Sequence, residues 1–498
     1  MTIRELVERQ AAERPQAVYA LSTESPAQIS FEELHQGCLR IGALLHSHGL
    51  KPGNTVSVVM PNGLMTLRVL LGSMFNGLCV NPVNLLSQPD QMRYVLAHSD
   101  CKLVFVAPAW ADAVRAHLVT LDRRVALIVT DPDGLRLPGE DGIDAVGTAS
   151  PAGQDLALLM YTSGTTGVPK GVMLTQANLV ANAVSISSEH ALTRQDRVMA
   201  VLPLYHINAF AVTMLAPLAH GGSLAIAPKF SAARYWQQVA ASGCTWMNVV
   251  PTVVSYLLEA QAPAASALSQ IRFCRSASAA LPGEHHRAFE KKFGIGIIET
   301  MGMTECVAPC FSNPLDPQQR KLGSVGRASG NEARIIDGQC QPLPDGSTGE
   351  IAIRGANVMR GYYKNEAATR AAFTPDGWLR SGDLGHRDSD GFYFVTGRIK
   401  ELIIKGGENI APREIDEALL AHPAVLDAAA VGVPDKHYGQ EILVAVVLRK
   451  GHACSEDQLR DFCVQRLGRY KTPKIIRFVA ELPRGPSGKV QRLKLLDG

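Results

Sequence analysis

The stretch Tyr161-Thr-Ser-Gly-Thr-Thr-Gly-Val-Pro-Lys170-Gly171 concentrates hydroxyl groups, glycines and one lysine in a short segment. The apolar run 156–160 precedes it and is typical of a buried strand, so a loop is expected where that strand ends. Glycines let backbone N–H groups approach phosphate oxygens, hydroxyls donate further hydrogen bonds, and the lysine adds a charge. The pattern predicts a polyphosphate-binding loop made of Thr162, Ser163, Gly164, Thr165, Thr166, Gly167 and Lys170.

Two other interpretations of this loop fit the sequence less well. A Walker A loop has the pattern Gly-x-x-x-x-Gly-Lys-[Ser/Thr], which cannot be aligned to residues 161–171. A Thr/Gly-rich surface turn would account for three or four such residues, whereas this pattern fills the whole stretch. We therefore favour phosphate binding.

The chain of 498 residues is too long for one ordinary core and predicts two or more domains. Its net charge of +3, without a long run of one sign, argues against nucleic acid as the main partner. Residues 1–20 carry charges and lack a signal-peptide core, and no run is long enough to span a bilayer. The cysteines are scattered without a Cys-x-x-Cys pair, so Cys306 and Cys310 are expected in a core or pocket. We expect a reduced, cytoplasmic enzyme, and the sequence leaves its oligomeric state open.

From residue 30 to about residue 320, short apolar runs alternate with longer amphipathic ones. This alternation predicts α/β layers with mostly parallel sheets. After residue 320, dense Gly/Pro/Asp turns and shorter strands predict a β-rich subdomain over about 321–397. The expected strands are 55–60, 102–106, 126–130, 223–227, 333–336, 350–354 and 392–395, and the expected helices are 63–75, 88–97, 178–187 and 235–241.

A compact tail follows the segment Thr396-Gly-Arg-Ile-Lys400. Pro412 is suited to the first turn of an amphipathic helix. Strands at about 425–432, 442–448 and 475–479 and a helix at 455–467 are expected after it. The sequence thus predicts a core over residues 1–397, a joining segment at 398–400 and a separate α+β domain over 401–498.

Further motifs follow the phosphate-binding loop in a definite order: Pro203-Leu-Tyr-His206, Gly302-Met-Thr304-Glu305, Trp378-Leu-Arg-Ser-Gly-Asp383, Gly397-Arg-Ile-Lys400 and Pro486-Ser-Gly-Lys489. In this order they are far more specific than any one of them alone. Over essentially its whole length the chain resembles the adenylate-forming superfamily of acyl-CoA synthetases, peptide-synthetase adenylation domains and luciferases. The resemblance implies a large α/β core and a mobile C-terminal domain that carries a catalytic lysine.

The resemblance places ATP on the core. It implies that the phosphate-binding loop closes over the β- and γ-phosphates. Thr304 would bond the α-phosphate, and Glu305 would supply an oxygen ligand to Mg²⁺, which bridges the phosphates. Without its neighbouring motifs, Thr-Glu would be interpreted as an ordinary helix cap.

The resemblance also indicates which residues would contact the ribose and adenine of ATP. Asp383 would accept both ribose hydroxyls, and Arg398 would reach the same ribose or a phosphate. An ordinary turn aspartate is the other interpretation of Asp383. Met301, before Gly302, departs from the family, which usually has an aromatic residue there; its thioether would cover the adenine instead.

Lys489 is expected to be the main catalytic residue. A carboxylate and ATP are both anions, and their reaction builds charge at the α-phosphate, so a fixed ammonium would stabilise the transition state. The other interpretation is a solvated lysine in a basic tail. By resemblance, Lys400 is the hinge on which the C-terminal domain swings. The loop with Gly406, Gly407 and Glu408 would help to form the coenzyme A channel.

The acid would bind beside Tyr205 and His206, where the family has its aromatic/histidine motif, with Asn208 nearby and His206 counted among the catalytic residues. A lone histidine after an apolar strand is otherwise more often structural.

The segment Ile271-Arg-Phe-Cys-Arg275-Ser-Ala-Ser278-Ala is similar in sequence to oxalate–CoA ligases and related small-acid ligases. Arg275, with Ser276 and Ser278, would suit a second anionic group on the acid. An outward-facing arginine at the strand end is the other interpretation of Arg275.

The implied activity is that of an AMP-forming acid–CoA ligase, with Mg²⁺ as cofactor and ATP, coenzyme A and a carboxylic acid as substrates. We favour a short acid with a polar or anionic second end, such as oxalate, malonate or sulfoacetate, over a medium-chain or aromatic acid. Coenzyme A is favoured over a carrier protein because Tyr205-His-Ile-Asn208 lacks an aspartate for an α-amine. An inactive nucleotide-binding homologue is the alternative from another class, supported only by Met301.

Overall fold

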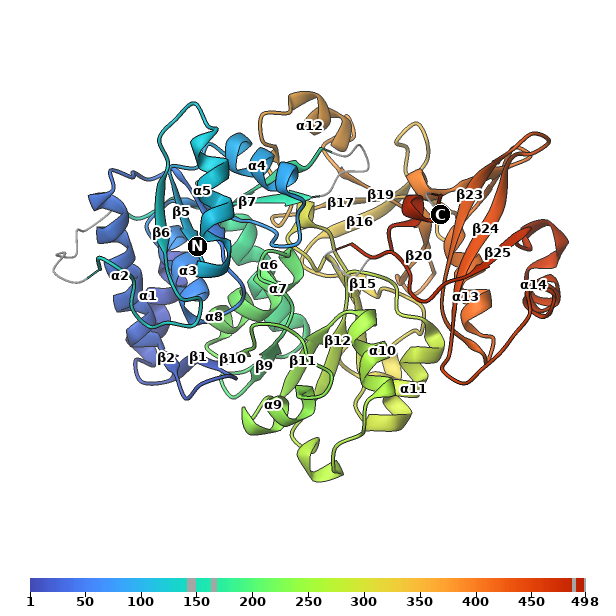
Figure 1. Ribbon diagram of the computed structural model, residues 1–498, viewed down its shortest axis with the longest axis horizontal. Helices are drawn as coiled ribbons and strands as arrows, with labels where there is room; N and C mark the ends of the chain where they lie inside the picture. Colours follow the sequence, from blue (N-terminus) through green and yellow to red (C-terminus); the bar gives the residue numbers. More distant parts are fainter. Residues whose placement is uncertain (141–148, 163–167, 486–489, 497–498) are drawn as a thin grey trace.

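The computed structural model describes residues 1–140, 149–162, 168–485 and 490–496. Four β-sheets organise these residues, and helices pack around them (Figure 1). The two large sheets form the body of the molecule, and the C-terminal residues, drawn in red, lie at one end of it. This confirms the predicted fold class, a layered α/β body with a β-rich part and a separate α+β C-terminal part. The boundaries at residues 397 and 401, with the hinge between them, stay predictions.

A seven-stranded sheet carries the predicted phosphate-binding loop, in the strand order β18-β8-β7-β4-β3-β5-β6. The strands from β7 to β6 pair in parallel, whereas β8 and β18 are added antiparallel at one edge. Parallel strands are usually covered on both faces, which is why Leu103–Val106 and Ala126–Val129 are continuous apolar runs in the sequence. The bounds are β3 Thr55–Val59, β4 Cys79–Pro82, β5 Leu103–Val106, β6 Ala126–Val129, β7 Leu156–Thr162, β8 Lys170–Thr175 and β18 Gly361–Tyr362.

A nine-stranded sheet lies beside it, in the order β15-β14-β13-β12-β11-β9-β10-β1-β2. The strands from β13 to β1 pair in parallel, so the carboxyl ends of β11, β12 and β13 lie side by side. Ligands of open α/β sheets bind at such carboxyl ends. The bounds are β1 Val18–Ser22, β2 Gln28–Ser30, β9 Arg197–Ala200, β10 Ser223–Ile226, β11 Trp246–Val249, β12 Phe273–Ser276, β13 Ile297–Met301, β14 Phe311–Ser312 and β15 Arg327–Ala328.

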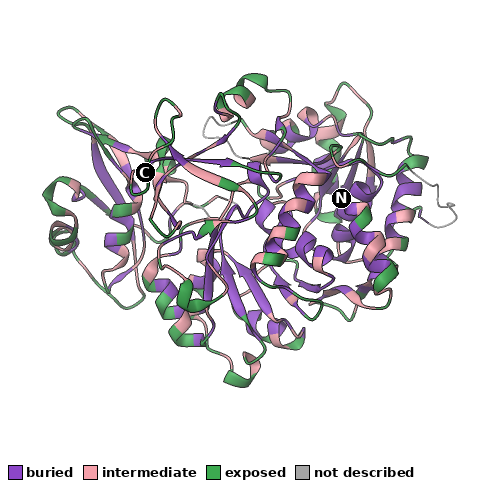
Figure 2. Cartoon of the chain, turned by 180° about the vertical axis from the view of Figure 1, so that it is seen from behind, coloured by how far each residue is buried: buried purple, intermediate pink, exposed green. Residues whose placement is uncertain are grey.

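Helix α3 (Leu64–Phe75) packs between the two large sheets. All of its residues are buried, and it contacts β3 and β4 on one side and β1 on the other. It is apolar around most of its circumference, as expected for a helix that is covered on every side. Figure 2 shows the buried residues gathered in the strands and helices of this interior. The other helices of this part are α1 Ile3–Glu13, α2 Phe31–Ser47, α4 Pro89–His98, α5 Ala111–Val119, α6 Gln176–Glu189, α7 Ile207–Ala209, α8 Ala216–His220, α9 Tyr235–Ala241, α10 Pro251–Glu259 and α11 Gly283–Phe293, with a π-helix at Phe210–Leu215.

Helix α6 starts directly where β8 ends. The Thr175 hydroxyl accepts a hydrogen bond from the Asn178 backbone N–H, and the Asn178 side chain accepts one from the Thr175 N–H. Such a reciprocal cap satisfies two N–H groups that have no partner within the helix. It fixes the path of the chain from the hairpin of β7 and β8 into α6.

Two smaller sheets follow. The β-rich part has the antiparallel order β16-β17-β19-β20, and the C-terminal part has β22-β21-β24-β23 with β25 paired to β24. Helices α13 and α14 contact each other, and α13 packs on β23. The bounds are β16 Glu332–Ile336, β17 Gly349–Arg354, α12 Glu366–Ala372, β19 Leu379–Arg387, β20 Tyr393–Arg398, β21 Ile403–Lys405, β22 Glu408–Ile410, α13 Pro412–Leu420, β23 Val425–Asp435, β24 Gly439–Leu448, α14 Glu456–Lys471 and β25 Ile475–Phe478.

The expected elements are all found, and the largest differences lie in the C-terminal part. The hairpin of β23 and β24 stays paired beyond the expected ends, with Asp435 opposite Gly439. Its outer pairs include Pro434, Asp435, Gly439 and Gln440, so the apolar pattern ends before the hydrogen bonding does. Helix α14 is interrupted at Gly468, whose backbone is non-helical with φ of 73°, directly after the expected end at residue 467, and a further short helical segment reaches Lys471.

Cys306 and Cys310 are buried free thiols, as expected for core or pocket residues. Within the described part of the chain, no three His, Cys, Asp or Glu side chains are grouped so that they could hold a metal ion. No helix in that part is both long and apolar enough to cross a membrane.

Candidate active site

One hairpin holds both ends of the predicted phosphate-binding loop. Strands β7 and β8 are antiparallel neighbours, and Thr162 lies directly opposite Lys170. Tyr161, at the end of β7, is anchored by its hydroxyl, which lies 2.7 Å from Nδ1 of His98. The loop residues Ser163, Gly164, Thr165, Thr166 and Gly167 lie outside the described residues.

The Thr304-Glu305 turn follows the end of β13. A Cβ atom at Gly302 would lie 2.5 Å from the Ala308 Cβ and 2.6 Å from its Cα, so only glycine fits there. Thr304 and Glu305 then form a short 3-10 turn, η4 (Thr304–Cys306), and β8 contacts this turn. The tight return of the chain brings the predicted phosphate and metal residues next to the strand that starts at Lys170.

Glu305 and Lys170 share a neighbour that the sequence analysis missed. The Tyr362 hydroxyl donates to Oε1 of Glu305 at 2.9 Å. Nζ of Lys170 lies 5.0 Å from the centroid of the Tyr362 ring. Tyr362 follows Gly361 in a tyrosine-rich stretch, and no local pattern there pointed to a partner so distant in sequence.

Asp383 and Arg398 face each other across β19 and β20. Nε of Arg398 lies 2.9 Å from Oδ1 of Asp383, with the carboxylate buried and the guanidinium partly exposed. The nearby carboxylate of Asp383 is the main reason why the pKa of Arg398 is raised. The pair offers charged groups of both signs at one edge of the β-rich sheet. Met301 stands half-buried at the end of β13.

The predicted acid pocket lies at the carboxyl ends of β11 and β12. His206 begins α7, and its ring contacts Tyr205 edge-on, with 4.8 Å between the ring centroids. Ser278 has a left-handed backbone with φ of 74°, which is unfavourable for a residue with a side chain. Its hydroxyl accepts a hydrogen bond from Nδ2 of buried Asn208 at 3.2 Å. Strained residues of this kind gather at functional sites.

Arg275 is fully buried, so its interpretation as an outward-facing arginine is wrong. Its Nη1 donates to Oδ1 of Asn208 at 2.7 Å and to Oδ1 of Asn248 at 2.6 Å. Burial lowers its pKa to about 9. Its Nε and Nη2, like the hydroxyl of buried Ser276, have no hydrogen-bond partner among the described residues. Arg275 is therefore a buried guanidinium with two nitrogens available for a further partner.

Asn248 was missed in the sequence, although a signal was present. It is a fully buried amide in the apolar strand Trp246-Met-Asn-Val249, and an asparagine there needs polar partners. It finds one in Arg275 and another in Asn208, whose Oδ1 lies 3.4 Å from Asn248 Nδ2.

The C-terminal candidates lie on a different part of the molecule. Lys400 is exposed in the turn η6 (Ile399–Glu401), next to Arg398. Gly406 and Gly407 form the exposed turn between β21 and β22, with φ of 55° and 87°, and Glu408 begins β22. Lys489 lies outside the described residues.

Glu299 is a buried carboxyl group on β13, the strand that pairs with β12. Its Oε1 accepts a hydrogen bond from the Leu281 N–H at 3.2 Å, and its Oε2 has no partner among the described residues. Burial raises its pKa from 4.5 to about 7, and Arg413 of α13 opposes this only in part.

A pH effect on stability follows from Glu299. Because folding raises the pKa of Glu299, its contribution to the free energy of unfolding is fully present below about pH 4.5. This contribution is lost as the pH rises through 7. Between pH 5.5 and 8 the loss is roughly 2 kcal/mol. We expect Glu299→Gln to remove this decrease in the free energy of unfolding, as measured by urea denaturation at both pH values. Glu284→Gln, at an exposed carboxylate of α11, should keep the wild-type decrease; a Glu299→Gln curve that does the same would contradict the assignment.

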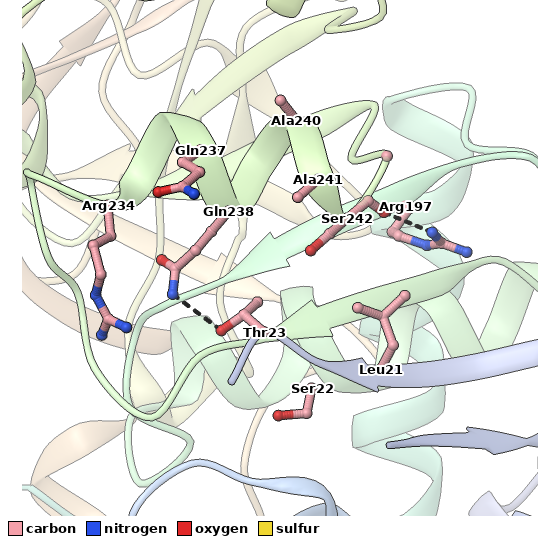
Figure 3. Close-up of a pocket in the computed structure, with 11 residues that line it drawn as sticks. Leu21, Ser22, Thr23, Arg197, Arg234, Gln237, Gln238, Ala240, Ala241 and Ser242 are labelled. Carbon is pink, nitrogen blue, oxygen red and sulfur yellow. Dashed lines mark hydrogen bonds between the residues drawn. The ribbon is translucent and has the colours of Figure 1, made fainter. Parts of the chain in front are cut away.

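A hollow of about 610 Å³ beside α9 contains none of the predicted site residues (Figure 3). Its polar groups bond one another: Gln238 Nε2 donates to Thr23 Oγ1 at 3.2 Å, and Arg197 Nη1 donates to the Ser242 carbonyl at 2.6 Å. We assign no ligand to it. It is lined by Leu21, Ser22, Thr23, Arg197, Arg234, Gln237, Gln238, Ala240, Ala241, Ser242 and Gly243.

Known proteins match this chain over its whole length. Residues 7–363 match the family model of AMP-binding enzymes, and residues 414–489 match that of the AMP-binding enzyme C-terminal domain. A sulfoacetate–CoA ligase of Cupriavidus necator is 58% identical, with 100% of this chain and 97% of that protein covered. An oxalate–CoA ligase of Arabidopsis thaliana is 34% identical over 95% of this chain and 94% of its own. The crystal structure of ATP-bound MatB from Rhodopseudomonas palustris matches with a TM-score of 0.93 at 30% identity, covering 100% of this chain and 99% of that one.

Proposed function

Because this chain belongs to the family of AMP-binding enzymes and is an AMP-forming acid–CoA ligase, we propose that its acid is short and carries a second anionic end. Sulfoacetate is the leading candidate, since the relative of that specificity is 58% identical over the whole chain. The reaction has two steps. The carboxylate attacks the α-phosphate of ATP and releases pyrophosphate, and the thiol of coenzyme A then attacks the acyl-adenylate and releases AMP.

The buried guanidinium of Arg275 is the observation that carries this proposal. Two of its nitrogens have no hydrogen-bond partner among the described residues, and unpaired buried polar groups are costly. An anionic group that reached them would form charge-assisted hydrogen bonds. An alkyl chain or an aromatic ring in the same place would leave these nitrogens unpaired. The pocket chemistry therefore favours a sulfonate or a second carboxylate over a medium-chain or aromatic acid.

Glu305 fits a magnesium ion that is held mainly through ATP. Mg²⁺ is commonly bound through one or two carboxylates together with substrate phosphates. Glu305 is a buried carboxylate, and the Tyr362 hydroxyl donates to its Oε1. We propose that it holds Mg²⁺ when ATP binds, and that the ion then neutralises phosphate charge.

The remaining ATP contacts are proposed as follows. Lys170 and the phosphate-binding loop hold the β- and γ-phosphates, and Thr304 bonds the α-phosphate. Asp383, held in place by Arg398, accepts the ribose hydroxyls. Met301 and Gly302 lie against the adenine.

The C-terminal domain is proposed to serve the two steps in turn. Lys489 neutralises charge between the carboxylate and the α-phosphate during adenylation, which is electrostatic stabilisation of the transition state. Rotation at Lys400 then withdraws it and brings Gly406, Gly407 and Glu408 to the path of coenzyme A.

The substrate proposal is tested by pyrophosphate release with a panel of acids, each with and without coenzyme A. We expect the highest kcat/KM with sulfoacetate, followed by oxalate or malonate, and far lower values with octanoate and benzoate. Pyrophosphate release without a thioester product would point to a different acceptor. A preference for octanoate or benzoate would refute the second-anion proposal, and no release with any acid would indicate an inactive homologue.

A further inference from the structure

The segment 357–363 is bonded to the backbone of the Thr304-Glu305 turn. The Met359 N–H donates to the Glu305 carbonyl at 2.8 Å. Nδ2 of Asn357, a buried side chain, donates to the Cys306 carbonyl at 2.9 Å. These bonds join two segments that are far apart in the sequence, so a shift of one moves the other.

The same segment is bonded to the strand that begins at Lys170. Strand β18 pairs antiparallel with β8, and Tyr362 lies opposite Val172. The Tyr363 N–H also donates to the Gly171 carbonyl at 2.8 Å. Tyr362 therefore stands on a short strand that is fixed on one side to the turn of Glu305 and on the other to the base of the phosphate-binding loop.

The Tyr362 side chain joins the two charged groups themselves. Its hydroxyl donates to Glu305 Oε1, while its ring faces the Lys170 ammonium. Between the described residues, no ion pair joins Lys170 directly to Glu305. The Tyr362 side chain thus contacts both opposite charges, the carboxylate through its hydroxyl and the ammonium through its ring.

We propose that Tyr362 is a positioning residue of the adenylation site: it orients the Glu305 carboxylate for Mg²⁺ and holds Lys170 for the phosphates of ATP. The inference rests on the proposed role of Glu305. The hydroxyl occupies one carboxylate oxygen and leaves the lone pairs of the other for the ion. Groups that orient a metal-binding side chain in this way commonly alter metal affinity by at least tenfold when removed.

The test is the affinity for a non-hydrolysable ATP analogue, measured by calorimetry with and without Mg²⁺ and with no acid present. In Tyr362→Phe we expect the gain in affinity that Mg²⁺ provides to fall about tenfold. Tyr363→Phe is the matched control, because its hydroxyl donates instead to Asp100 Oδ2 at 2.7 Å. This variant should keep the full gain from Mg²⁺.

A second substitution separates the ring from the hydroxyl. Tyr362→Leu removes both, so Lys170 is free to pair with Glu305. We expect Tyr362→Leu to bind the metal-free analogue two- to fivefold more weakly than the wild type does, about the effect of losing one cation–π contact. Tyr362→Phe keeps the ring and should bind the metal-free analogue like the wild type.

Glu305→Gln distinguishes the inference from the function on which it rests. If Glu305→Gln loses the gain from Mg²⁺ and Tyr362→Phe keeps it, the positioning role is overturned and the role of Glu305 stands. If Glu305→Gln keeps the gain, both are overturned. Loss in both variants, with no further loss when they are combined, is the expected result.

Discussion

Lys489→Ala is expected to slow acyl-adenylate formation by about 10²–10³-fold, the usual loss when one group that stabilises developing charge is removed. The carboxylate and ATP repel each other, and charge grows at the α-phosphate as they react. A fixed ammonium offsets this repulsion only during adenylation. Thioester formation from supplied acyl-adenylate should therefore proceed at the wild-type rate. Pyrophosphate release and single-turnover thioester formation measure the two steps separately.

Lys494→Ala is the matched control for this variant. Lys494 belongs to the same basic tail and is exposed, so it represents the interpretation of Lys489 as a solvated lysine. We expect it to leave both steps unchanged. Equal loss of both steps in Lys489→Ala, or the same small effect in both variants, would contradict the catalytic role.

Arg275→Leu is expected to lower kcat/KM for sulfoacetate by at least about a hundredfold, because a hydrogen bond to a charged group contributes 1.5–3 kcal/mol and two nitrogens are available. Activity with a short apolar acid such as butyrate should fall less or rise, since the pocket then lacks an unpaired guanidinium. The ratio of the two kcat/KM values is the measurement. A general loss of folding would lower both values together.

Arg272→Leu controls for the loss of an arginine from the same segment. Arg272 is only partly buried, and its Nη1 lies 2.7 Å from Oδ1 of Asp196. It precedes Arg275 on the same segment of the chain. Its removal should leave the ratio of sulfoacetate to butyrate unchanged. An unchanged ratio in Arg275→Leu as well would refute the second-anion site.

The layered α/β fold could be predicted because its signal is local. The strands at 103–106 and 126–129 are continuous apolar runs, as is typical of parallel strands covered on both faces. Amphipathic segments between them predicted helices. Boundaries were less accurate in the C-terminal hairpin, where backbone pairing continues beyond the expected ends to Asp435 and Gly439.

The reaction class could be predicted because the motifs are short and their order along the chain is specific. Glu305, Asp383 and Lys489 each stand in a short motif of their own, so each could be predicted from its immediate neighbours in the sequence. Their roles stay predictions, because the geometry around a bound substrate is not part of the chain. The direction of Arg275 could not be predicted, since a strand covered on both faces is apolar on both, and alternation does not reveal which neighbour a side chain meets.

The sequence by itself determined the layered fold and the AMP-forming ligase chemistry, since apolar periodicity and short motifs are carried by neighbouring residues. Only the tertiary structure revealed that Arg275 is buried between Asn208 and Asn248, and that Tyr362 joins Lys170 to Glu305. These contacts connect residues far apart in the sequence, and they form only when the sheets have packed and paired. Burial is also what gives them their effect, because a charge or hydroxyl removed from water depends on the few partners that the fold places beside it.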